Sequence, residues 1–158
     1  MIPEQALLKA SLLACGQRVA KLRQSVLKTQ SLFPLTVARA QTLTDDEEES
    51  IDAMILRYSQ CVSMIQDQVF RGIAHLEQED IGDKSNRDKA LLMEKLGAIA
   101  SATEFGTAAL LRNKFAHHYP DQSQARVDRL NLVIAESEFV LAAFASIEAY
   151  LSRKGFAI

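Results

Sequence analysis

The sequence predicts an all-α fold, an up-and-down bundle of about five helices. Apolar residues recur at alternating steps of four and three over long stretches, which places them on one face of a helix. Capping sequences, prolines and a glycine stand at the ends of these stretches, where helices begin and stop. Nothing in the sequence favours a β-sheet. With 158 residues, of which 48% are hydrophobic, the chain is long enough to form one bundle domain over 1–158.

The first half of the chain predicts two long helices. The first stops before Pro34, and its apolar stripe consists of Leu8, Leu12, Cys15, Val19, Leu22 and Val26. Residues 35–43 are predicted to form a connection or a short helix. The second long helix begins at the capping box of residues 44–47, Thr-Asp-Asp-Glu, whose acidic residues suit a helix N-terminus. Its stripe, which predicts a central position, is Ile51, Ile55, Tyr58, Val62, Ile65, Val69 and Ile73.

The second half of the chain predicts three more helices after a charged loop over 77–87. A third helix is expected over about 86–98, and the apolar residues of this region are Leu91, Leu92, Leu96 and Ile99. A capping box at 101–104, Ser-Ala-Thr-Glu, opens a fourth helix. A long last helix follows Pro120 and ends at Gly155. Its buried stripe is predicted to be Leu130, Val133, Ser137, Val140, Phe144, Ile147 and Leu151.

Composition narrows the class of protein. The net charge of −2 excludes a generally basic nucleic-acid coat, so any binding of RNA or DNA requires a local patch. Cys15 and Cys61 lie inside apolar repeats and are predicted to be reduced core residues. No stretch approaches the roughly 18 to 20 apolar residues of a membrane span, and the N-terminus does not resemble a secretion signal. We therefore expect a cytoplasmic protein.

Residues 112–119, Arg-Asn-Lys-Phe-Ala-His-His-Tyr, are the part of the chain that indicates most about function. A permanent cation, a group that titrates near neutrality and a phenol lie within about two helical turns, a combination that suits chemistry on a phosphate. Arg112 falls in the middle of an apolar face, which is formed by Phe105, Ala108, Ala109, Phe115 and Ala116. A guanidinium in such a place needs a carboxylate, a carbonyl or a cleft that receives an anion.

Helix geometry separates Arg112 from His117. Asn113 and His117 share a face, but His117 lies about 140° from Arg112 around a straight helix. Two arrangements bring the guanidinium and the imidazole together. Pro120 disfavours helical geometry at Tyr119 and so encourages the helix to end there, which redirects the histidines. Alternatively, the two groups act across a symmetric dimer.

The full string resembles the signature of HEPN-domain proteins, and most closely that of HepT-like toxins, which are encoded beside minimal nucleotidyltransferase antitoxins. The residues of this signature are Arg112, Asn113, His117, Tyr119, Pro120 and Asp121. Arg57 and Tyr58 in the second helix, and the order of the later helices, also agree with such domains. The resemblance extends over roughly 45–154 and implies a HEPN-like helical bundle, with the N-terminal helix belonging to it.

The resemblance implies an RNA endonuclease that works without a metal or another cofactor, at a composite cleft of a homodimer. Arg112 and His117 are the expected catalytic residues. A planar guanidinium can hold phosphate oxygens and stabilise charge in the transition state. A histidine with a pKa near 6.5 can transfer protons or orient the ribose 2′-hydroxyl. DNA, which lacks that hydroxyl, is expected to resist cleavage.

The remaining residues of the string are expected to assist or regulate. Asn113 would orient His117 or bind phosphate, and Lys114 and His118 would help to bind the substrate or the modifying enzyme. In the toxins that the chain resembles, the motif tyrosine accepts AMP from the partner nucleotidyltransferase, which implies this role for Tyr119. The added negative charge would then compete for the arginine that the RNA needs.

Other interpretations of the same residues remain open. Arg112 can form a structural salt bridge, and the two histidines can form hydrogen bonds at a helix end. A metal site at His117 and His118 is disfavoured, because no Cys, Asp or Glu stands at ligand spacing from both. The chain can also be a non-catalytic HEPN module that binds a nucleotidyltransferase, or a helical bundle that binds an unrelated partner.

Overall fold

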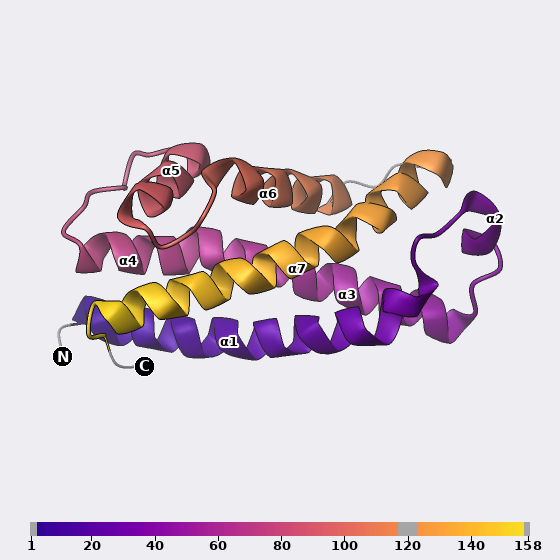
Figure 1. Ribbon diagram of the computed structural model, residues 1–158, viewed down its shortest axis with the longest axis horizontal. Helices are drawn as coiled ribbons and strands as arrows, with labels where there is room; N and C mark the ends of the chain where they lie inside the picture. The colour runs from indigo at the N-terminus through magenta and orange to yellow at the C-terminus, as the bar shows by residue number, and fades with distance from the viewer. Residues whose placement is uncertain (1–2, 117–122, 157–158) are drawn as a thin grey trace.

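A computed structural model describes residues 3–116 and 123–156, and within these ranges it contains helices and no strand. The predicted all-α helical bundle is thereby confirmed. Figure 1 shows long helices packed side by side and running alternately in opposite directions, with both ends of the chain at the same end of the bundle. In chain order the helices are α1 (Pro3–Thr29), η1 (Gln30–Leu32), α2 (Val37–Ala40), α3 (Asp45–Met64), η2 (Ile65–Val69), α4 (Phe70–Leu76), α5 (Asn86–Leu96), α6 (Ala102–Ala116) and α7 (Ser123–Arg153).

Helix α1 contributes its predicted stripe to the core, and every member of that stripe is at most 5% exposed. The two cysteines are free and fully buried, as expected. Burial raises the pKa of both thiols to about 12, so they stay protonated and unreactive at neutral pH. α1 and α4 approach closely at Gly72, where an added Cβ atom would come within 2.5 Å of Leu8 Cδ1. A side chain at this crossing would therefore displace Leu8.

The second long helix runs from Asp45 to Leu76 and changes its winding on the way. The predicted capping box is present, because the Thr44 hydroxyl accepts from the Glu47 N–H and the Glu47 carboxylate accepts from the Thr44 N–H. From Ile65 to Val69 the helix adopts one π-turn, after which α4 continues. A π-turn adds a residue to the turn and rotates the residues that follow it about the helix axis. The buried residues of this turn are Ile65, Gln66 and Val69. Periodicity alone predicted an uninterrupted α-helix here.

The connection between α1 and α3 is tied to the last helix. Asn131 of α7 donates through its amide to the Leu35 carbonyl oxygen and accepts from the Leu35 N–H, at 3.0 and 2.7 Å. The short helix α2 begins after Thr36, whose hydroxyl accepts from the N–H of Arg39. Leu35 belongs to a small second cluster of the core, formed by the buried residues Leu35, Ile51, Val127 and Leu130.

Helices α5 and α6 are joined by a tight corner that determines where α6 begins. α5 ends at Gly97, which adopts the left-handed conformation with φ of 87°. Ser101 accepts from the N–H of Glu104, and Glu94 accepts from the N–H of Ala102, so two of the first-turn donors are satisfied by side chains. The core side chains of α5 are Ala90 and Met93. Leu91, one of the leucines noted in the sequence, is instead 40% exposed.

The long helix α7 buries its predicted stripe from Leu130 to Leu151, each member at 5% exposure or less. By length and composition alone, the stretch Gln124–Arg153 could also cross a membrane, which differs from the expectation that no segment is apolar enough. The residues of the stripe account for part of this apolar character, because they face the core. The central helix of a soluble bundle meets the same criteria of length and composition.

Candidate functional site

Tyr58 fixes the register of α6 against α3. Its hydroxyl donates to the Ala108 carbonyl oxygen at 2.6 Å, and its ring packs edge-on against Phe115 with the centroids 6.5 Å apart. Tyr58 is fully buried, which raises its pKa, and the Glu136 carboxylate raises it further while Arg112 acts in the opposite direction. Because Ala108 and Phe115 bracket Arg112, these contacts hold the arginine at a set height beside α3.

Arg112 is half-buried on α6 and is held by two neutral partners. Its Nη1 donates to the Ser63 hydroxyl at 2.6 Å, and its Nη2 donates to the Asn113 side-chain oxygen at 2.8 Å. Its Nε is buried and has no hydrogen-bond partner in the described part of the chain. Among the residues that the structure describes, no carboxylate forms an ion pair with it. Each terminal nitrogen therefore keeps one N–H for an anion, and the positive charge is not neutralised.

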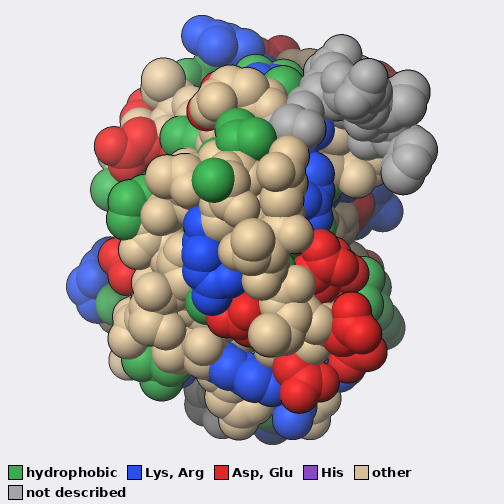
Figure 2. All heavy atoms as spheres, turned by 90° about the vertical axis from the view of Figure 1, so that its right-hand side faces the viewer, with side chains coloured by type: hydrophobic (Ala, Val, Ile, Leu, Met, Phe, Trp, Pro, Cys, Tyr) green, Lys and Arg blue, Asp and Glu red, His purple; other side chains and the backbone are tan. Residues whose placement is uncertain are grey.

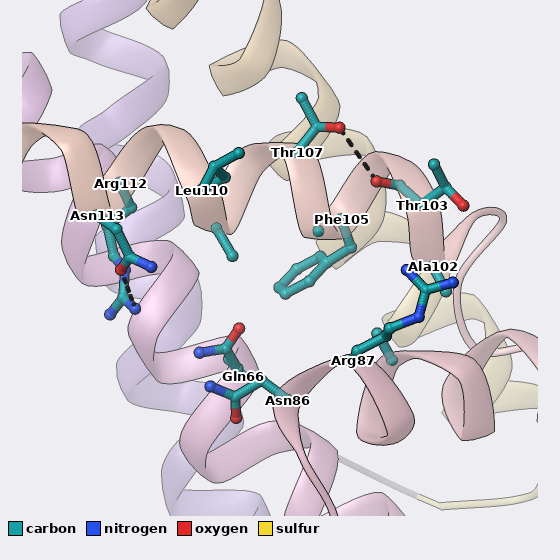
Figure 3. A pocket seen from close by; sticks show the side chains of 13 residues that line it. Gln66, Asn86, Arg87, Ala102, Thr103, Phe105, Thr107, Leu110, Arg112 and Asn113 are labelled. Atoms are coloured by element: carbon teal, nitrogen blue, oxygen red, sulfur yellow. Dashed lines mark hydrogen bonds between the residues drawn. The ribbon is translucent and has the colours of Figure 1, made fainter.

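Arg112 and Asn113 separate two pockets in the surface. The first pocket, of about 440 Å³, lies between the π-turn, α5 and α6, and Figure 3 shows it from close by. Its polar lining includes Gln66, Asn86, Arg87, Thr103, Arg112 and Asn113. The second pocket, of about 460 Å³, lies between α3 and α6, and it is lined by Asp52, Ile55, Leu56, Ser59, Ser63, Arg112, Asn113, Phe115 and Ala116.

A third pocket of about 440 Å³ continues from the second, with which it shares Ser59 and Ser63. We call the three pockets together the α3–α6 groove. Arg87 lies in its first pocket, Arg112 between the first and second, and Arg18 in the third, while Asp52 is its one acidic lining residue among those described. The groove is thus locally basic in a chain of net charge −2.

One end of the molecule does not share this bias. On the end drawn in Figure 2, basic and acidic side chains are interspersed, and no broad face of one sign appears there. Acidic residues fill the first turn of α3, from Asp45 to Glu48. The arginines of the groove, in contrast, line open pockets, where they can contact a polyanion.

The structure places three of the six predicted site residues. Arg112 and Asn113 come together, because the Asn113 side-chain oxygen accepts a hydrogen bond from Arg112 Nη2. Lys114 is exposed on the next position of α6. His117, His118 and Tyr119, with Pro120 and Asp121, lie outside the described residues. Whether the imidazole meets the guanidinium within one subunit or across a dimer therefore stays a prediction.

Two residues of the groove escaped the sequence analysis. Ser63, the partner of Arg112, stands 49 positions away along the chain and has no motif of its own. Gln66 is 3% exposed. The sequence could have indicated it, because it is a polar residue inside an apolar run of the second helix. No group of three or more His, Cys, Asp or Glu within 3–116 and 123–156 is arranged to hold a metal ion. Comparisons with protein-family models, with curated proteins and with solved structures find no match.

Proposed function

We propose that the protein is a metal-independent RNA endonuclease that acts as the toxin of a toxin-antitoxin pair, with the α3–α6 groove as its substrate site. The observation that supports this most is the state of Arg112. It is half-buried, lacks a carboxylate partner among the described residues, and stands where two pockets meet. Of the three partners expected for a guanidinium on this apolar face, a cleft that receives an anion fits best.

Arg112 supplies electrostatic stabilisation in this proposal. One free N–H on each terminal nitrogen binds the oxygens of the scissile phosphate, and the guanidinium stabilises the charge that develops as the 2′-oxygen attacks the phosphorus. Ser63 and Asn113 position the arginine by accepting hydrogen bonds from its other two terminal N–H groups. The 2′-hydroxyl loses its proton, the bond to the 5′-oxygen breaks, and that oxygen gains a proton. The products are a 2′,3′-cyclic phosphate and a 5′-hydroxyl.

His117 carries out the proton transfer, and His118 and Lys114 help to hold the RNA. We propose that a homodimer completes the cleft, because a straight helix directs Arg112 and His117 to different sides. Leu56 and Leu110, which line the two pockets on either side of Arg112, are 59% and 57% exposed. A second subunit can cover these two leucines, but five other leucines of the described surface are also exposed, so helix geometry is the main support for the dimer.

Regulation is proposed at Tyr119. A nucleotidyltransferase antitoxin attaches AMP to its hydroxyl, and the new phosphate competes with RNA for Arg112. The pair acts in the cytoplasm, where its RNA substrates are. Incubation with the cognate nucleotidyltransferase and ATP should raise the intact mass by one AMP group, and Tyr119→Phe should abolish the gain. An unchanged mass of the wild-type protein would remove this part of the proposal.

The nuclease itself is tested with purified protein, labelled RNA and a chelator. Wild-type protein should cleave RNA and leave DNA of the same sequence intact. Arg112→Ala and His117→Ala should each lower the rate by about 100-fold or more, while melting temperatures stay close to wild type. Arg23→Ala removes an exposed arginine of α1 outside the groove and is the matched control. RNA that stays intact, with a nucleotidyltransferase still bound, would instead support a non-catalytic binding module.

A further inference from the structure

Gln66 is a buried polar residue at the first pocket. The residue is only 3% exposed, and its side chain makes no hydrogen bond with the described residues, but its amide atoms are not among the fully enclosed atoms without a partner, which in the described part of the chain are Arg112 Nε and Ser137 Oγ. In Figure 3 its carboxamide points from the π-turn toward α6, with Phe105 on one side and Arg112 and Asn113 on the other. An amide in such a place is satisfied only from the first pocket, by water or by a ligand.

Gln66 lies in the π-turn, whose first and last residues, Ile65 and Val69, are fully buried. It also stands four residues after the fully buried Val62, so it shares the buried face of the helix. Gln68, which lies in the same turn, is exposed to solvent. Single π-turns inside α-helices interrupt regular hydrogen bonding and are frequent at functional sites. Here the turn delivers one donor and one acceptor to the floor of a pocket.

The first pocket has the dimensions and the lining of a small-molecule site. Its volume of about 440 Å³ lies within the range of known ligand pockets, roughly 300 to 1,000 Å³. Phe105, Ala90 and Ala102 provide apolar walls, and Asn86 and Arg87 stand on its exposed rim. A flat ring with polar edges fits such a lining, because its faces meet apolar atoms and its edge meets the amide.

Gly106 is a second, independent sign that something enters this pocket. It lies inside α6, where glycine is less stable than alanine, and it lines the pocket. A Cβ atom added at this position would meet no atom within 4 Å. No described residue therefore requires a glycine there, in contrast to Gly72. A missing side chain at the wall leaves room for the close approach of a ligand.

We propose that the first pocket binds one nucleobase of the RNA strand and that Gln66 recognises its edge. This inference rests on the proposed ribonuclease function, and it names the residue that makes that function base-selective. A carboxamide offers a donor beside an acceptor, which matches the edge of a base, and glutamine pairs best with adenine. Arg112, at the same pocket, binds the adjoining phosphate, so base and phosphate are held together.

The test measures binding apart from cleavage. Labelled 2′-O-methyl oligonucleotides of A, C, G or U lack the nucleophile, and their affinity for the full-length protein is measured by fluorescence anisotropy in chelator. We expect oligo-A to bind tightest. Gln66→Met, which keeps the length of the side chain, should weaken binding of the preferred base by about 5- to 100-fold and leave the other bases within about twofold. Gln68→Met, in the same turn, should change nothing.

Gly106→Met provides a second variant that leaves Gln66 in place. Its side chain fills the pocket, so it should abolish the base preference while the melting temperature stays the same or rises. A preference for any one base that both variants remove supports the proposal. Equal affinity for all four oligonucleotides, or a preference that survives both variants, overturns it. If the protein cleaves RNA but binds all four bases equally, the ribonuclease proposal stands and the base pocket is rejected. If the protein shows a base preference that depends on Gln66 but cleaves no RNA, the ribonuclease proposal is rejected and the base pocket stands.

Discussion

Two seams of the bundle each hold an arginine against a serine of another helix, and they differ in what surrounds it. In the seam between α1 and α3, Arg57 donates to the Ser25 hydroxyl at 2.8 Å and to the Lys21 carbonyl oxygen at 3.2 Å. In the seam between α3 and α6, Arg112 donates to the Ser63 hydroxyl, and its buried Nε has no partner among the described residues. Arg57 lines none of the three pockets of the α3–α6 groove, whereas Arg112 lines two of them.

The difference shows that two arginines in similar packing can have different roles. Arg57 caps a carbonyl and a hydroxyl, so its contacts belong to the fold. Arg112 has N–H groups that are not used in these bonds and that lie beside open space, so it can bind an anion. Four experiments, ordered from the largest expected effect to the smallest, test this difference and the packing of the helices around it.

The largest expected effect separates the two arginines directly. Arg112→Ala should lower RNA cleavage by about 100-fold or more and change stability little. Arg57→Ala should lower the free energy of unfolding by about 1 kcal/mol, because Ser25 and Lys21 lose a donor, and leave the cleavage rate within about twofold. Urea titration and a cleavage assay on both variants measure this. The same loss of activity in both, or a large loss of stability in Arg112→Ala, would remove the distinction.

Tyr58→Phe should produce the next largest effect, and it acts on stability. The substitution removes the bond to the Ala108 carbonyl oxygen inside the α3–α6 seam. A buried bond of this kind contributes about 1 to 2 kcal/mol to the free energy of unfolding. Urea unfolding monitored by circular dichroism tests it. An unchanged free energy of unfolding would show that the hydroxyl does not hold α6 on α3.

Ser137→Ala should have a smaller effect of the opposite sign. Ser137 is fully buried on α7, and its hydroxyl has no hydrogen-bond partner in the described part of the chain. Removing an unsatisfied hydroxyl is expected to raise the free energy of unfolding by about 1 kcal/mol or less. The same urea titration tests it, with Ser146→Ala as a control. Ser146 donates to the Ala98 carbonyl oxygen, so its loss should destabilise.

Glu136→Gln should have the smallest effect, and one that depends on pH. Burial raises the pKa of the Glu136 carboxyl above 4.5, and Glu104 raises it further. Because the folded protein binds this proton more tightly than the unfolded chain, the carboxyl loses its stabilising contribution as the pH rises from about 4.5 through the raised pKa. Glu136→Gln should therefore raise the melting temperature at pH 7 and not at pH 4. Equal shifts at both pH values would contradict the assignment.

The sequence predicted the helices well because their signals are local. The three-and-four spacing of the α1 and α7 stripes identified the buried residues, and Thr44 marked the start of α3. Prediction failed where the backbone departs from regular spacing. The π-turn at Ile65–Val69 has no sequence mark in a single chain, and Gln66, a residue of this turn, lines the first pocket.

The sequence predicted that Arg112 belongs to the candidate site, but it did not predict which residues Arg112 contacts. The apolar neighbours of Arg112 along α6 indicated that the guanidinium needs a partner. Local spacing gives no information on which residue of another helix meets it, so Ser63 and the two pockets emerged only in three dimensions. The second half of the motif, His117 to Tyr119, lies outside the described residues and stays a prediction.

The central claim is that Arg112 and His117 cleave RNA through its own 2′-hydroxyl. Mass spectrometry of the fragments made by the wild-type protein in chelator tests it most directly. We predict fragments that end in a 2′,3′-cyclic phosphate and begin with a 5′-hydroxyl, and their loss in both Arg112→Ala and His117→Ala. Fragments with a 3′-hydroxyl and a 5′-phosphate, or cleavage that persists in both variants, would contradict the account.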